Sequence, residues 1–179
     1  MPYLALFLAL AETSASFAPG PHLDRILWSP ETLSLAEPMD VTRAGVLRGA
    51  DALLGVPYHY AGLGPGHCPS GEHAACCDCS GLVRLAYAAA GLETPRTSAA
   101  LAGAGRSATR AEMRPGDILI FRSDGSRNGQ ANHSGVYIGS GLFIHAGSRG
   151  VRLDDLDGPY WGNARRPRLR DIRRVEGDG

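Results

Sequence analysis

The apolar positions of the chain follow a helical period in its first half and form short continuous or alternating runs in its second half. Helical spacing predicts one helix over 43–54, capped by Thr42, and a second over 79–90, capped by Asp78. A short helical stretch is expected over 97–103. Short apolar runs bounded by turn residues predict strands at 118–121, 136–138, 142–144, 151–153 and around 163–168. Helices followed by an antiparallel meander indicate an α+β fold.

Length and charge predict a single globular domain. The chain has 179 residues, 44% of them hydrophobic, and is too short for two ordinary domains. Its formal net charge is zero, so bulk charge gives no reason to expect binding to nucleic acid or to an anionic membrane. We place the catalytic domain at 43–170 and a polar tail at 171–179, and we expect a monomer. The arginine cluster between 165 and 174 is interpreted as a solvated terminal segment.

The N-terminus has features of an export signal. The apolar run Tyr3–Ala11 is too short to span a bilayer, but it suits the apolar region of a signal peptide. Ser16 and Ala18 supply small residues for cleavage after Ala18, although no basic residue precedes the run. We therefore expect a signal peptide at 1–18, a leader or linker at 19–42, and export to the periplasm, envelope or exterior. A buried N-terminal helix of a cytoplasmic protein is the alternative.

Four cysteines lie close together, at positions 68, 76, 77 and 79. This clustering predicts a disulfide from Cys68 to Cys76 or Cys77, which would close a short loop. A zinc site that includes His67 and His73 is the alternative. The spacing matches no common zinc pattern, and adjacent cysteines are awkward ligands for one tetrahedral ion, so we expect no metal.

Cys79 and two histidines together indicate thiol catalysis. Cys79 stands at a predicted helix start, where unpaired N–H groups favour a thiolate. His133 can take the thiol proton and pass it to a leaving amine. His145 lies on the next predicted strand, where facing side chains are about 5 Å apart, close enough to orient the base. Gly81 and Gly135 are expected to leave room for a polypeptide substrate. Each of these residues alone is more often structural, and only their combination and order favour catalysis.

The chain resembles the NlpC/P60 family of cell-wall peptidases in six ordered motifs. The nucleophile and histidine motifs are specific in this order, whereas the glycine-rich ones are weak. The motifs are Gly55–Gly62 (GVPYHYAG), Asp78–Val83 (DCSGLV), Leu92–Ser98 (LETPRTS), Arg114–Phe121 (RPGDILIF), His133–Gly139 (HSGVYIG) and Phe143–Ala146 (FIHA). The resemblance extends over about 43–170.

The resemblance implies a papain-like fold in which N-terminal helices pack on a central antiparallel sheet. It also implies hydrolysis of an amide bond in peptidoglycan stem peptides, most often between γ-D-glutamyl and a diamino acid, without a metal or organic cofactor. By motif match Cys79 is the nucleophile, which forms a thioester acyl-enzyme, His133 is the base and His145 orients it.

The same motif match implies roles at the substrate side. Tyr58 lines the site and helps to hold the oxyanion, and Asp78 and Ser80 contact the substrate. Ala61 departs from the family, because it replaces the first of two glycines. The loop between Gly62 and Asp78 is expanded and rich in cysteine, so it can cover the substrate cleft.

Two alternative functions remain open: a thiol amidase or acyltransferase, and a non-enzymatic metal or redox module built on the cysteines.

Overall fold

The computed structural model describes residues 41–64, 66, 68, 75–124 and 129–176. The expected signal peptide at 1–18 and nearly all of the leader at 19–42 lie outside the described residues. No helix in this described part of the chain is long and apolar enough to cross a membrane.

Among the described residues, two long helices and two short ones precede the central strands. They are α4 (Val41–Asp51), α5 (Cys79–Ala88), α6 (Ser98–Leu101) and the 3-10 helix η1 (Arg110–Glu112). Helix α4 begins at Val41, one residue before Thr42, so Thr42 lies within the helix and the predicted cap is wrong. Helix α5 begins where the sequence predicts, because the Asp78 carboxylate accepts the N–H of Gly81 at 2.7 Å.

Six strands form one antiparallel sheet in the order β1-β6-β2-β3-β4-β5. The strands are β1 (Arg106–Ser107), β2 (Ile118–Phe121), β3 (His133–Gly139), β4 (Leu142–Gly147), β5 (Gly150–Asp155) and β6 (Leu169–Arg174). Strand β2 has the predicted bounds, and β3, β4 and β5 are longer than the apolar runs that indicated them. This combination of helices and an antiparallel sheet confirms the α+β class.

The last strand differs most from the prediction. A strand was expected around 163–168, whereas β6 runs from Leu169 to Arg174 and pairs with both β1 and β2. The sheet therefore continues past residue 170, into the segment expected to be a polar tail. Strand β6 is hard to recognise because only Leu169 and Ile172 are apolar and three of its other four residues are arginines.

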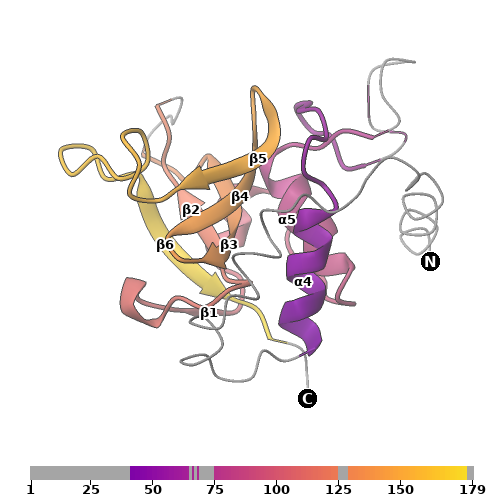
Figure 1. Cartoon of the computed structure of the whole chain (residues 1–179), viewed down its shortest axis with the longest axis horizontal. Helices are drawn as coiled ribbons and strands as arrows, with labels where there is room; N and C mark the ends of the chain where they lie inside the picture. Colours follow the sequence, from indigo (N-terminus) through magenta and orange to yellow (C-terminus); the bar gives the residue numbers. More distant parts are fainter. Residues whose placement is uncertain (1–40, 65, 67, 69–74, 125–128, 177–179) are drawn as a thin grey trace.

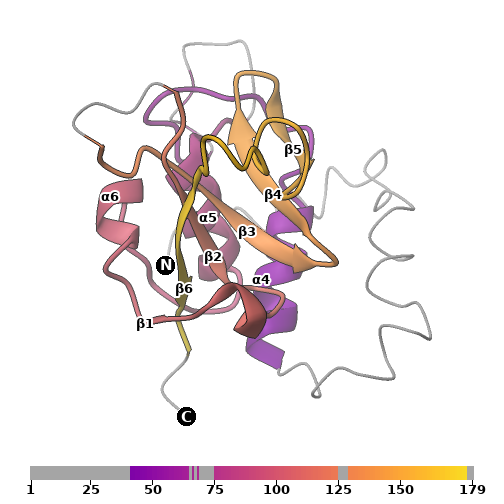
Figure 2. The same ribbon diagram turned by 90° about the vertical axis from the view of Figure 1, so that its left-hand side faces the viewer.

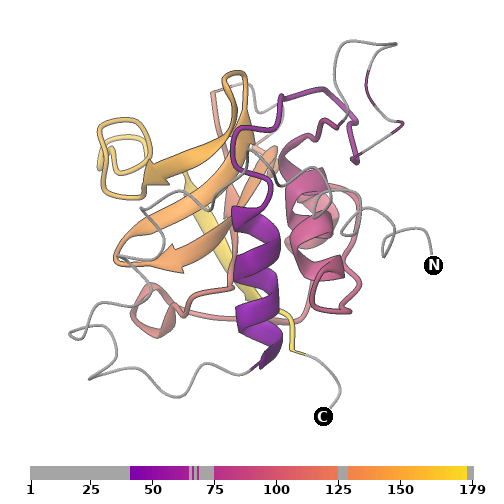
Figure 3. The same cartoon turned by 45° about the vertical axis from the view of Figure 1, so that its right-hand side comes forward.

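The two faces of the sheet are covered differently. Helices α4 and α5 lie on one face (Figures 1 and 3), where they bury a core with Ile118, Ile120 and Val136. The opposite face holds a smaller aromatic core that includes Phe121 and Trp161. Trp161 comes from the segment between β5 and β6, which loops over the end of the sheet (Figure 2). Successive residues of β2 and β3 thus serve different cores, as expected for strands buried on both sides.

Candidate active site

Cys79 is the first residue of α5 and lies against the short helix α6. Its thiol is part-buried, and Sγ lies 3.4 Å from Ser98 Oγ. Ser98 Oγ in turn lies 3.2 Å from Ser134 Oγ on β3. The N–H groups in the first turn of α5 carry partial positive charge, which attracts negative charge. The local structure therefore places the thiol at a helix N-terminus, next to the strand that begins at His133.

The two predicted histidines are hydrogen-bonded to each other. His133 Nε2 lies 2.9 Å from His145 Nδ1, and the two rings meet edge to face. The residues are not directly opposite, because His145 pairs with Gly135, two residues along β3 from His133. Among the described residues no hydrogen bond joins Cys79 to His133. Such bonds are often long in a free enzyme and shorten with substrate bound.

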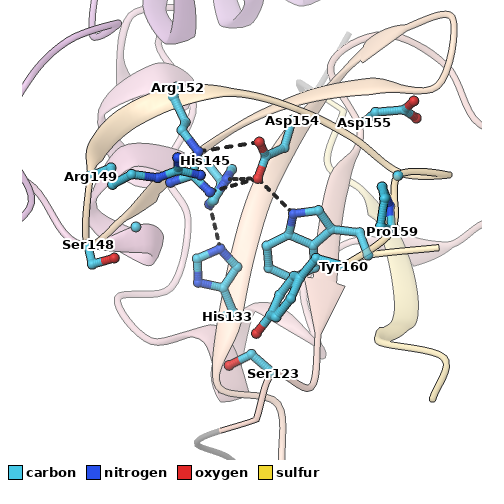
Figure 4. A pocket seen from close by; sticks show the side chains of 13 residues that line it. Ser123, His133, His145, Ser148, Arg149, Arg152, Asp154, Asp155, Pro159 and Tyr160 are labelled. Atoms are coloured by element: carbon cyan, nitrogen blue, oxygen red, sulfur yellow. Dashed lines mark hydrogen bonds and ion pairs between the residues drawn. The ribbon is translucent and has the colours of Figure 1, made fainter. Parts of the chain in front are cut away.

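Asp154 on β5 extends this chain of hydrogen bonds. Its Oδ2 lies 2.9 Å from His145 Nε2, on the side of the ring away from His133 (Figure 4). Trp161 Nε1 donates to the same oxygen at 2.8 Å, and Arg152 donates to both carboxylate oxygens. Burial raises the pKa of Asp154, but the hydrogen bonds from Arg152, Trp161 and His145 outweigh it and hold the pKa below its ordinary value.

The environment keeps both imidazoles neutral. Burial is the main cause, and it lowers the pKa of His133 to about 3, with a further decrease from the neighbouring His145. Burial also lowers the pKa of His145 to about 4, although the hydrogen bond to Asp154 opposes it. Trp161 contributes to this burial, since its indole stacks on His133 with ring centroids 5.3 Å apart.

The hydrogen-bond chain assigns the tautomer of each neutral ring. The Asp154 carboxylate can only accept, so His145 must donate from Nε2 and accept at Nδ1. His133 must then donate from Nε2, which leaves the lone pair on its Nδ1. A neutral imidazole with a free ring nitrogen is the form that can take a proton from a thiol.

The predicted substrate residues form a second cluster around Arg96. The Arg96 guanidinium donates to both oxygens of Asp78, at 3.0 and 2.8 Å, to Ser80 Oγ and to the carbonyl of Gly62. Asp78 and Ser80 are buried, while Tyr58 is 38% exposed. Burial raises the pKa of Tyr58, with smaller contributions from the charges of Cys79 and Asp78. Tyr58 is thus a protonated hydroxyl near Cys79 that a substrate can reach.

The glycines flanking the site serve packing rather than substrate access. A Cβ on Gly81 would collide with the carbonyl oxygen of Gly62, which carries the loop against α5. A Cβ on Gly135 would lie 2.7 Å from the Ile144 carbonyl oxygen and 3.2 Å from His145 Cβ. These glycines allow the loop to approach α5 and His145 to approach β3. The sequence analysis expected these glycines to leave room for a polypeptide substrate. The atoms that a Cβ would meet belong to the protein itself, so the packing explains both glycines without a substrate.

The cysteine cluster divides into a disulfide and two free thiols. Cys68 is bonded to Cys76, one of the two pairings expected, and Cys77 and Cys79 are free. Burial raises the pKa of Cys77 to about 12, so its thiol stays protonated and unreactive at neutral pH. The disulfide occupies two sulfurs that a zinc ion would need. Within the described part of the chain no group of three His, Cys, Asp or Glu could hold a metal ion, and His67 and His73 lie outside it.

An open cavity of about 670 Å³ adjoins the histidines. Its walls come from β3, from the β4–β5 hairpin and from the segment before β6, and not from α5. The lining includes Ser123, His133, His145, Ser148, Arg149, Arg152, Asp154, Tyr160 and Trp161. The sequence motifs identified only the two histidines of this set.

Comparison with known proteins settles the family. A family model described as NlpC/P60 family matches residues 55–169, more than half of the chain. The chain belongs to the NlpC/P60 family. All six motifs that indicated this family lie within the matched segment, as do Cys79, His133 and His145.

Curated relatives of this NlpC/P60 chain are named as endopeptidases. "Probable endopeptidase Rv2190c" of Mycobacterium tuberculosis is 38% identical over 128 residues, which make up 69% of this chain and 29% of the relative. "Peptidoglycan DL-endopeptidase CwlO" of Bacillus licheniformis is 42% identical over 90 residues, 49% of this chain and 19% of the relative. The chain thus spans less than a third of the length of these relatives.

The solved structure of a peptidoglycan hydrolase has the same fold over nearly the whole chain. The peptidoglycan hydrolase RipB from Mycobacterium tuberculosis superimposes with a TM-score of 0.60 and 25% identity, and the match covers 90% of this chain and 93% of RipB. This match supports the expected architecture of helices packed on an antiparallel sheet.

Proposed function

We propose that this protein is a cysteine endopeptidase that hydrolyses amide bonds in bacterial peptidoglycan stem peptides. The observation that carries the proposal is the chain of hydrogen bonds from Asp154 through His145 to His133, beside a cysteine at a helix start. The names of the relatives support peptidoglycan as the substrate. The favoured bond joins γ-D-glutamyl to a diamino acid, as the family resemblance implies.

In the first half of the reaction, Cys79 attacks the scissile carbonyl. His133 Nδ1 takes the thiol proton as Sγ bonds to the carbonyl carbon, and the new oxyanion is held by N–H groups at the start of α5 and by the Tyr58 hydroxyl. The carbon–nitrogen bond then breaks as the His133 imidazolium gives its proton to the leaving amine. The product of this half is a thioester between Cys79 and the acyl fragment.

In the second half, water hydrolyses the thioester. His133 Nδ1 takes a proton from the water molecule as the water oxygen attacks the thioester carbonyl carbon. The carbon–sulfur bond then breaks, His133 returns the proton to the Cys79 sulfur, and the acyl fragment leaves as a carboxylic acid. His145 holds the His133 ring in place during both halves, and Asp154 stabilises the positive charge that develops on the rings. No step requires a metal or an organic cofactor.

Asp78 and Ser80 are assigned to the acyl side of the substrate, together with Tyr58. In the free protein the Asp78 carboxylate is already paired with Arg96. The family resemblance implies that residues at the positions of Asp78 and Ser80 bind a free amino end of the substrate in some members, and such a group would share the Asp78 carboxylate with Arg96. Tyr58 is 38% exposed, so a substrate can reach its hydroxyl directly.

Export from the cytoplasm is part of the proposal. Peptidoglycan lies outside the cytoplasmic membrane, and the Cys68–Cys76 disulfide is of a kind that persists in oxidising compartments. The alternative of a metal or redox module loses its support, because one pair of cysteines is bonded and Cys77 is buried with a raised pKa.

The test is mass spectrometry of defined muropeptides after incubation with wild type, Cys79→Ala and Cys77→Ala. Cys79→Ala should lower the rate of cleavage by at least about 10⁴-fold, since the nucleophile is lost. Cys77→Ala is the matched control, because it removes the other free thiol, and it should stay active. The product masses identify the bond, and a product joined to an amine instead of water would indicate an acyltransferase. Unchanged cleavage by Cys79→Ala would refute the mechanism.

A further inference from the structure

The cavity beside the histidines contains one arginine, Arg149, that the proposed catalytic steps do not use. Arg152 is paired with Asp154 at 2.8 Å, so these two charges balance. Arg149, in the turn between β4 and β5, also lines the cavity and is exposed. Within the described residues it has no ion-pair or hydrogen-bond partner. Figure 4 shows its side chain extending toward the group formed by His145 and Arg152.

The other charged or titratable groups at this cavity form no ion pair with Arg149 among the described residues. His133 and His145 have lowered pKa values and carry no charge at neutral pH. Asp155 also lines the cavity, but its carboxylate accepts the N–H of Asp157. Figure 4 shows Asp155 on the far side of the cavity from Arg149. The charge of Arg149 also helps to lower the pKa of His145, after the larger effects of burial and Arg152, so it acts within the site.

The position of the cavity indicates which half of the substrate it receives. The base that protonates the leaving amine must face the leaving segment. His133 lines this cavity, whereas Cys79, Tyr58 and the Asp78–Arg96 pair do not. The leaving segment therefore enters the cavity, and the acyl segment lies on the side of Tyr58.

We propose that Arg149 forms a subsite for a free carboxylate on the leaving segment, close to its new amino terminus. The inference rests on the proposed peptidase function and specifies its substrate. A guanidinium binds a carboxylate through two parallel hydrogen bonds, which fixes orientation as well as charge. Substrates whose leaving diamino acid carries a free side-chain carboxylate are thus preferred over those in which this group is an amide or is missing.

The experiment compares two synthetic stem peptides that share the scissile bond and differ only in a carboxylate or carboxamide on the leaving diamino acid. Wild type should cleave the carboxylate form with a kcat/KM about tenfold higher, mainly through a lower KM. Arg149→Gln should abolish this preference, and Arg149→Lys should keep part of it. Arg170→Gln is the matched control, because Arg170 is an exposed arginine on β6 outside the cavity, and it should behave as wild type.

A binding measurement separates this inference from the proposed function. The leaving fragment alone, with its free amine and carboxylate, is titrated calorimetrically into Cys79→Ala and into Cys79→Ala combined with Arg149→Gln. Binding that is weakened about tenfold by the second change supports the subsite even if no peptide is cleaved. Equal binding by both proteins, or an unchanged carboxylate preference in active Arg149→Gln, would overturn the subsite and leave the peptidase proposal intact.

Discussion

At the scale of single residues, Asp154 determines the protonation pattern of the proposed catalytic group through its hydrogen bond to His145. Its ionised carboxylate makes His145 donate from Nε2, and this leaves the lone pair of His133 on Nδ1. Arg152 and Trp161 hold the carboxylate in place and keep it ionised. Asp154 is therefore a positioning residue that acts through His145.

Replacing Asp154 with Asn should reverse this pattern. An amide N–H can donate to His145 Nε2, so His145 would donate from Nδ1 and His133 would carry its proton on the nitrogen that must accept one. We expect kcat to fall about 10²–10⁴-fold with little change in KM. Steady-state kinetics of Asp154→Asn, with a thermal melt to show retained folding, test this expectation.

The control for this prediction is Asp155→Asn, the next residue of β5. Asp155 is exposed and, although it also lines the cavity, it forms no hydrogen bond or ion pair with either histidine among the described residues. Asp155→Asn therefore leaves the tautomers unchanged, and any effect should fall on KM and not on kcat. Asp154→Glu should recover part of the lost rate, because it restores a carboxylate. A loss that appeared only in KM would contradict a positioning role.

The sequence motifs identified the proposed catalytic residues but not the residues that hold the two histidines in place. Cys79, His133 and His145 stand in recognisable motifs, whereas Asp154 and Trp161 stand in segments without one. The missed signal was alternation along β5, where Val151 and Leu153 face the helix-side core and Arg152 and Asp154 face the other way. Trp161 could not be placed, because it reaches the histidines through an irregular segment whose path depends on tertiary packing.

At the scale of elements, β6 is held in the sheet by a buried ion pair. Arg174 Nε and Nη2 each donate to the Asp117 carboxylate at 2.7 Å, and Nη2 also donates to the Glu112 carbonyl at 2.6 Å. The two side chains are 4% and 1% exposed. Asp117 stands in the turn before β2, so the pair connects the turn to the end of the last strand. This explains why an arginine-rich segment belongs to the sheet.

Asp117→Asn should destabilise the fold strongly, because it leaves the Arg174 guanidinium buried without a counter-charge. We expect the free energy of unfolding to fall by about 3–5 kcal/mol. Urea denaturation measures this change. The control is Asp157→Asn, which breaks the exposed ion pair with Arg110 and should cost less than about 1 kcal/mol. Similar losses in both variants would show that the buried pair has no special role.

The loop before α5 contains Ala61, a residue that departs from the family motif. Ala61 stands where the family has glycine, and its φ of 62° lies in the left-handed region that favours glycine. The loop keeps its path through the hydrogen bond from Asp78 N–H to the Gly62 carbonyl. Sequence alone identified the substitution. Only the backbone conformation shows that alanine is strained there.

At the scale of the whole molecule, the order of elements was predictable and the covering of the sheet was not. The strands β2 to β5 follow from apolar runs, because each contributes side chains to a buried core. The second core depends on Trp161 and Leu156, which lie outside regular strands and fold over the aromatic residues of β2 and β4. This covering buries the two histidines, and it therefore couples the stability of the whole fold to pH.

The free energy of unfolding should decrease as the pH falls below about 6.5, the ordinary pKa of histidine. The folded protein holds the pKa of His133 at about 3 and that of His145 at about 4. Between these values and 6.5 the unfolded chain binds protons that the folded chain excludes, so acid favours unfolding. Each histidine contributes a slope of at most about 1.4 kcal/mol per pH unit, and this contribution fades to zero within about one pH unit above 6.5.

Urea denaturation between about pH 7 and pH 4.5 measures this slope, above the range in which most carboxylates titrate. His145→Gln removes one of the two groups, so its slope should be about half that of wild type, whatever its stability at pH 7. Cys79→Ala removes the neighbouring thiol, keeps both imidazoles and should retain the full slope. If His145→Gln and wild type lost stability at the same rate, His145 would be charged in the folded protein. The tautomer chain that begins at Asp154 would then be wrong, because a charged His145 donates from both ring nitrogens.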